Sequence, residues 1–97
     1  MDTAPDLAAV AAIVRRHLPR TGYRAYLFGS RARGRARPTS DWDIGILGPE
    51  PVRGAVLEML RDELDGLRTL HTFDVVDLSA TDDGFRAAAL DEAVQLE

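Results

Sequence analysis

The stretch that decides the fold reads FGSRARG over residues 28–34 and continues, after a short polar loop, as SDWDI over residues 40–44. The Gly-Ser turn in its first part can place backbone N–H groups and a hydroxyl against phosphate oxygens. Asp41 and Asp43 are two residues apart on a predicted strand, so their carboxylates point to the same face. Carboxylate oxygens are ligands for Mg²⁺. A triphosphate that is bound to the metal on one side needs hydrogen-bond donors to its phosphate oxygens on the other side. The stretch therefore predicts a site for nucleotidyl transfer.

The composition is that of an ordinary soluble globular protein. The chain has 97 residues, of which 45% are hydrophobic and 29% charged, and no apolar run is long enough to span a bilayer. It has no cysteine, which excludes a disulfide framework and thiolate metal sites. The two histidines, His17 and His71, lie too far apart to suggest zinc. We expect a single domain over residues 1–97, located in the cytoplasm and without a membrane partner.

The charge is distributed unevenly along the chain. The net charge is −4, yet eight of the 12 basic residues, all of them arginine, lie between Leu7 and Ser40, where no Asp or Glu occurs. We therefore expect the first part to face phosphate and the acidic second part to hold metal. Arg31, Arg35 and Arg37 alternate with small residues and predict a solvent-facing basic ridge. No aromatic residue is interleaved with these arginines to stack on bases, and we therefore do not expect direct nucleic-acid binding.

Hydrophobic periodicity and breaker residues predict the elements. A first helix is expected from the N-cap Asp6 to about Leu18, closed by Pro19. Strands are expected over residues 23–28, 41–47 and 70–78, and further helices over residues 30–36, 52–67 and 82–96. This order predicts an α/β (α+β) fold with a small mixed sheet of about three strands flanked by helices. The last helix is expected to bury an apolar stripe that consists of Phe85, Ala89, Leu90, Ala93 and Val94.

Three aspartates are the candidate catalytic residues and metal ligands. Strand alternation puts Asp41 and Asp43 on one face, and Trp42, Ile44 and Ile46 on the other, where they can pack under a helix. A D-x-D pair alone is most often a solvated strand edge, but the preceding Gly-Ser turn favours a metal site. A two-metal site also needs a third carboxylate. Asp74 is the preferred candidate, because a charge in the middle of a strand needs a partner.

Two further residues bear on this predicted metal site. Gly45 is next along the same face as the two aspartates, where it is expected to leave room for the site. Asp77 is a weaker candidate ligand than Asp74. It lies near the end of its strand, where ordinary solvation or helix capping would suffice.

Gly29, Ser30 and Arg33 are the candidate phosphate-binding residues. In isolation Ser30 would be interpreted as a turn or N-cap serine, but after Gly29 and opposite the carboxylates a phosphate contact is favoured. The guanidinium of Arg33 could clamp the triphosphate or pair with Asp41 or another acid, and the sequence leaves both alternatives open.

The chain resembles the minimal nucleotidyltransferases of the DNA polymerase β superfamily, a group found as antitoxin partners of HEPN-domain toxins. The resemblance rests on residues 28–34 and 40–43, on Asp74 in a late strand, and on LDEAV over residues 90–94. It implies a palm-like fold and Mg²⁺-dependent transfer of a nucleoside monophosphate from ATP or another NTP. Asp41 and Asp43 would hold two metal ions, and Asp74 would complete the coordination of one of them. The third carboxylate can also accept the proton of the attacking hydroxyl.

The chain departs from the family pattern at four positions. Arg35 and Arg37 are additional arginines, and Ala93 and Gln95 replace a glycine and an aromatic residue that are frequent near the C-terminus of the family.

The length of the chain bears on the acceptor. A sheet with its helices uses about 97 residues, which leaves no separate domain to bind an acceptor. The resemblance implies a HEPN toxin that forms a hetero-oligomer with the chain and receives AMP on a tyrosine hydroxyl. One alternative is a non-catalytic antitoxin, a binding module that neutralises its partner by contact. Another is a nucleotidyltransferase that acts on a small molecule of the aminoglycoside type. Ser30, Asp41, Asp43 and Asp74 favour an enzyme over the first, and the lack of an acceptor domain disfavours the second.

Overall fold

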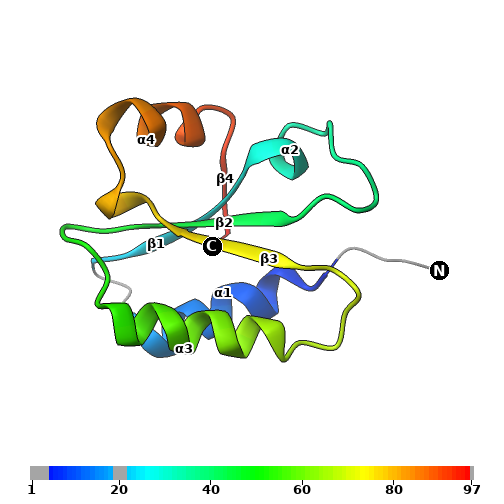
Figure 1. Ribbon diagram of the computed structural model, residues 1–97, viewed down its shortest axis with the longest axis horizontal. Coiled ribbons are helices and arrows are strands. Elements are labelled where there is room, and N and C mark those ends of the chain that lie inside the picture. Colours follow the sequence, from blue (N-terminus) through cyan, green and yellow to red (C-terminus); the bar gives the residue numbers. More distant parts are fainter. Residues whose placement is uncertain (1–4, 19–21, 97) are drawn as a thin grey trace.

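A four-stranded mixed sheet forms the centre of the molecule, as seen in a computed structural model that describes residues 5–18 and 22–96 (Figure 1). The strands are β1 (Arg24–Phe28), β2 (Trp42–Leu47), β3 (Phe73–Asp77) and β4 (Val94–Gln95), in the order β3-β2-β1-β4. β2 is antiparallel to β1 and parallel to β3, and β4 pairs antiparallel with β1. The start of β2 therefore lies between the end of β1 and the start of β3.

Two helices cover one face of the sheet. α1 (Leu7–His17) and α3 (Gly54–Asp65) pack against each other below the sheet in Figure 1. Asp6 caps α1 as predicted, because its carboxylate accepts hydrogen bonds from the first free N–H groups of the helix. The main core lies between these helices and the sheet, and its most deeply buried members include Val10, Ile44, Ile46, Leu60 and Leu64. The prediction that Trp42, Ile44 and Ile46 point toward helices is confirmed.

Shorter elements cover the opposite face. These are α2 (Gly29–Ala32), the 3₁₀ turn η1 (Leu78–Ala80) and α4 (Asp83–Leu90), with α2 and α4 above the sheet in Figure 1. A second, smaller core of Phe28, Leu78 and Ala89 lies beneath them.

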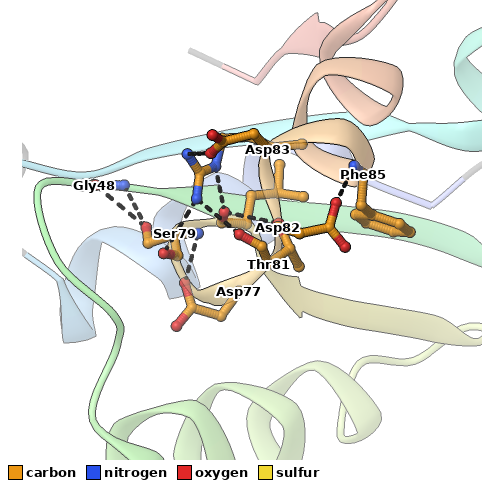
Figure 2. Close-up of polar contacts among 9 residues, drawn as sticks. Gly48, Asp77, Ser79, Thr81, Asp82, Asp83 and Phe85 are labelled. Carbon is orange, nitrogen blue, oxygen red and sulfur yellow. Dashed lines mark hydrogen bonds and ion pairs between the residues drawn. The ribbon is translucent and has the colours of Figure 1, made fainter.

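Hydrogen bonds fix α4 to η1. The guanidinium of Arg86 donates to the backbone carbonyls of Leu78, Ser79 and Thr81. The carboxylate of Asp82 accepts a hydrogen bond of 2.7 Å from the N–H of Phe85 and so caps α4 (Figure 2). The position of α4 over the sheet is therefore set by polar contacts as well as by the small core.

Several elements are shorter than predicted, and the helix expected over residues 52–67 is α3 at residues 54–65. α2 stops at Ala32 instead of residue 36, because Gly34 takes a left-handed φ of +71° and the N–H of Arg35 bonds the carbonyl of Ser30. β3 begins at Phe73 instead of residue 70, and the side chain of Leu70 is 90% exposed.

The prediction of a helix over residues 82–96 is wrong in its second half. α4 ends at Leu90, Glu92 adopts a left-handed φ of +64°, and the chain turns into β4. The sheet therefore has a fourth strand that the sequence did not indicate. Val94 and Phe85, both predicted to point inward, are 49% and 46% exposed.

Two further predictions concern Pro19 and the membrane. Pro19, predicted to close the first helix, lies outside the described residues. In the part of the chain that the structure describes, no helix has the length and apolar character needed to cross a membrane.

Candidate active site

Asp43 and Asp74 are neighbours on the two parallel strands of the sheet, the inner strand β2 and the edge strand β3. Each is the second residue of its strand, and the two are paired in register. Residues paired across adjacent strands, which lie about 4.8 Å apart, point to the same face. This face is the one that α2 and α4 cover, because Ile44, the next residue after Asp43 on β2, points to the opposite face and into the main core. Asp74 is exposed, so solvent reaches its charge, whereas we expected a charge in the middle of this strand to need a partner.

Asp41 directly precedes β2 and is held by the residue that precedes β3. The hydroxyl of Thr72 donates a hydrogen bond to the carboxylate of Asp41, and the carbonyl of Thr72 accepts one of 2.9 Å from the N–H of Trp42. Sequence reasoning missed Thr72. Its position two residues before Asp74 was the available signal, because that spacing on a strand places both side chains on one face.

The pKa of Asp43 is raised above its ordinary value of 3.8. Burial is the largest cause, because it disfavours the charged form, and the negative charges of Asp74 and then Asp41 add to it. Oxygen donors with unbalanced negative charge fit Mg²⁺, the metal implied by the resemblance. Within residues 5–18 and 22–96, no three His, Cys, Asp or Glu side chains converge in this conformation. The carboxylate of Asp41 is instead engaged with Thr72.

This raised pKa predicts a stability effect of Asp43→Asn. Between the ordinary pKa of 3.8 and the raised pKa of the folded state, the folded chain binds more protons at Asp43 than the unfolded chain does. The free energy of unfolding therefore falls as pH rises through this range. In the presence of a chelator, the Asp43→Asn variant is expected to have a higher free energy of unfolding than the parent chain at pH 7. The difference should vanish below the ordinary pKa, which urea denaturation at several pH values would measure. A parent chain that is the more stable of the two at pH 7 would contradict this prediction.

Gly29 brings the start of α2 against Asp43. Its φ is +74°, and a Cβ built at this position would lie only 2.2 Å from Oδ2 of Asp43. Both the backbone conformation and the close approach therefore require glycine. Ser30, the next residue, is half-buried in α2. The Gly-Ser turn and Asp43 thus meet in space.

Arg33 pairs with an acid of the C-terminal turn. Its Nε lies 3.4 Å from Oε2 of Glu92, and its Nη2 donates to the carbonyl of Ala88 in α4. Of the two alternatives left open by the sequence, this arrangement corresponds to pairing with an acid, although the acid is not Asp41.

The prediction that Arg31 belongs to a solvent-facing ridge is wrong. Its guanidinium donates to the carbonyls of Pro38 and Ser40 and lies 4.5 Å from the centroid of the Trp42 ring. These contacts tie the polar loop before β2 to α2. Arg35 and Arg37 are exposed, as predicted.

Two residues predicted near the site serve the fold instead. A Cβ at Gly45 would lie 2.5 Å from Cδ1 of Leu78, so Gly45 makes room for the second core and not for ligands. The carboxylate of Asp77 accepts hydrogen bonds from the N–H groups of Val52 and Ser79. Asp77 therefore joins the segment before α3 to η1, which agrees with the capping role considered for it.

The sequence pattern of the family described as "Polymerase beta, Nucleotidyltransferase" matches residues 23–96. The chain belongs to this family. The match spans the sheet from β1 to β4 and includes all the candidate site residues. This nucleotidyltransferase is 30% identical over 81 residues to the Haemophilus influenzae protein named "Probable protein adenylyltransferase MntA". The aligned part covers 84% of this chain and 69% of that protein.

Solved structures of toxin–antitoxin complexes have the same fold as this nucleotidyltransferase. One complex, determined with AMP-PNP, matches with a TM-score of 0.77 and 23% identity over 96% of this chain and 73% of the other. Another contains a tri-AMPylated HEPN toxin of Shewanella oneidensis with its MNT antitoxin. Here the TM-score is 0.69 and the identity 21%, over 94% of this chain and 68% of the other. These likenesses establish the mixed α+β nucleotidyltransferase fold.

Proposed function

We propose that this chain is the antitoxin that transfers AMP from ATP to a tyrosine hydroxyl of a partner HEPN toxin and so neutralises it. The observation that carries this proposal is the contact of Gly29 with Asp43, which sets a Gly-Ser turn directly against paired carboxylates. The relative from Haemophilus influenzae is named a protein adenylyltransferase, and one neighbour in structure is a complex with an AMPylated HEPN toxin. Both support AMP transfer to a protein.

The proposed roles follow from the chemistry of each side chain. Asp41, Asp43 and Asp74 would hold the metal, and Gly29, Ser30 and Arg33 would donate to the phosphates. When bound, two Mg²⁺ ions supply positive charge for the attacking and leaving oxygens. For metal binding, the carboxylate of Asp41 has to exchange its hydrogen bond with Thr72 for a contact inside the site.

The reaction is an in-line displacement at the α-phosphorus. The tyrosine oxygen forms a new bond to phosphorus, the bond to the bridging oxygen breaks, and pyrophosphate leaves. The tyrosine proton passes to a carboxylate, for which we propose Asp74 because it is exposed and lies beside Asp43.

Mg²⁺ with ATP is expected to raise the melting temperature of the chain by on the order of 10 °C at ligand concentrations about 100-fold above Kd. Mg²⁺ alone should give a smaller increase, because it relieves the repulsion around Asp43 without phosphate contacts. Differential scanning calorimetry would measure both shifts. In a variant with Asp41→Asn and Asp43→Asn, neither shift is expected. A full ATP shift in that variant would argue against the metal assignment.

Arg33 is expected to leave Glu92 when a triphosphate binds. An exposed ion pair such as that of Arg33 with Glu92 contributes about 0–1 kcal/mol, whereas hydrogen bonds to charged groups contribute about 1.5–3 kcal/mol. The contact of Arg33 with phosphate should therefore be the more stable one. Arg33→Ala should therefore weaken ATP binding by roughly ten-fold or more, and Glu92→Gln should strengthen it. Arg24→Ala, at the other end of β1, is the control and should have no effect. Isothermal titration calorimetry would measure these affinities, and unchanged affinity in Arg33→Ala would assign that residue a structural role alone.

A further inference from the structure

A pocket of about 210 Å³ lies beside the Gly-Ser turn, and the reaction described above uses only two of its lining residues, Gly29 and Arg33. It is formed between the end of β1, α2 and α4. Its lining residues are Phe28, Gly29, Arg33, Phe85, Ala88 and Ala89. All but one of these side chains are apolar or absent.

The pocket adjoins the carboxylate site through two of its lining residues. Gly29 lines the pocket and also contacts Asp43. Phe28 is the cross-strand partner of Asp43, and partners of this kind have their Cβ atoms about 4.5–5.5 Å apart on one face of the sheet. A ligand whose phosphates lie at Asp43 and the Gly-Ser turn can therefore place its other end in the pocket.

The walls of the pocket suit a flat heterocycle. Phe85 is a large apolar side chain that remains 46% exposed, and its ring meets that of Phe28 edge to face with centroids 6.5 Å apart. Ala88 and Ala89 are small, which leaves the space open, and Arg33 supplies a planar cation at the rim. Nucleic-acid bases stack on aromatic rings and on guanidinium groups.

The pocket is small and its wall is preformed. Pockets for whole drug-sized ligands measure about 300–1,000 Å³, so this volume suits one part of a nucleotide. The helix that carries Phe85 is capped by Asp82 and is held to η1 by Arg86, as Figure 2 shows for the capping contact. The ring is therefore presented by an anchored helix.

We infer that the pocket between α2 and α4 binds the base of the nucleoside triphosphate, with Phe85 as the stacking residue. This inference rests on the proposed function and extends it from the phosphates to the base. It also explains why the ring of Phe85 is exposed beside the candidate active site, although the sequence pattern predicted that this ring would be buried.

The test compares ATP with inorganic tripolyphosphate, both with Mg²⁺, by titration calorimetry on four variants of the chain. Ala88→Leu fills the pocket and Phe85→Ala removes its stacking ring. Ala87→Leu, an exposed position on the same helix that does not line the pocket, and Met59→Ala, an exposed apolar residue on α3, are the matched controls. Ala88→Leu and Phe85→Ala are each expected to weaken ATP binding on the order of ten-fold and to leave tripolyphosphate binding unchanged. The controls should change neither.

Three outcomes would overturn the inference. If Ala88→Leu leaves ATP affinity unchanged, or weakens ATP and tripolyphosphate equally, the base does not lie in this pocket while phosphate binding stands. If labelling of the partner falls but ATP affinity does not, the pocket receives the acceptor instead. If the parent chain binds neither ligand, the proposed function fails first and this inference fails with it.

Discussion

Replacement of both Asp41 and Asp43 by asparagine is expected to slow AMP transfer by at least about a thousand-fold. The variant chain should remain folded. Metal ions contribute several kcal/mol of charge stabilisation, and each 1.36 kcal/mol changes the rate ten-fold. Asparagine keeps the size of each side chain and carries no charge, so neither the cost of burying a charge nor the repulsion from Asp74, which together raise the pKa of Asp43, opposes folding. Transfer would be measured as labelling of the partner protein from ATP that carries the label on its α-phosphate.

A matched control removes the same charge elsewhere. Asp62 and Asp65 are exposed on α3, across the sheet from the site, and their double replacement by asparagine should leave labelling unchanged. If the variant at Asp41 and Asp43 labels the partner near the parent rate, these two residues are not the catalytic carboxylates.

ATP turnover is expected to require the partner. The proposed acceptor is a tyrosine hydroxyl of the HEPN protein, and a correctly positioned reactant can supply about 7–11 kcal/mol of the barrier. The chain alone should therefore release almost no pyrophosphate, and addition of the partner should start its release. A coupled pyrophosphate assay on the chain, the partner and their mixture would measure this difference.

The control for this experiment is a partner in which the modified tyrosine is replaced by phenylalanine. It should bind the chain and give no pyrophosphate above the background of the chain alone. Turnover by the chain alone that matches turnover of the mixture would favour a small-molecule or water acceptor.

The central part of the fold could be predicted because its signals are local in the sequence. The cap at Asp6, the alternation around Ile44 and the turn at Gly29 each depend on neighbours within a few residues. The same locality let the sequence predict that the Gly-Ser turn and Asp43 come together. The register that places Asp74 beside Asp43 joins strands that are far apart in the sequence, and the sequence did not specify it.

The remaining features depend on tertiary contacts or on an unusual backbone conformation. The chain turns into β4 at Glu92, where a left-handed φ is adopted by a residue other than glycine, so the sequence carried no stop signal. The contacts of Arg31 join α2 to carbonyls up to nine residues later, and no pattern of side chains indicates carbonyl acceptors. Phe85 matched the apolar stripe of a helix, and periodicity cannot distinguish a core residue from one that lines an open pocket.

Mass spectrometry of the HEPN partner, after incubation with this chain, ATP and Mg²⁺, tests the proposed adenylyl transfer most directly. The partner is expected to gain the mass of one or more AMP groups, located on a tyrosine by fragmentation, and to gain none with the variant at Asp41 and Asp43. A partner that is neutralised on mixing but keeps its original mass would contradict adenylyl transfer and would support neutralisation by contact.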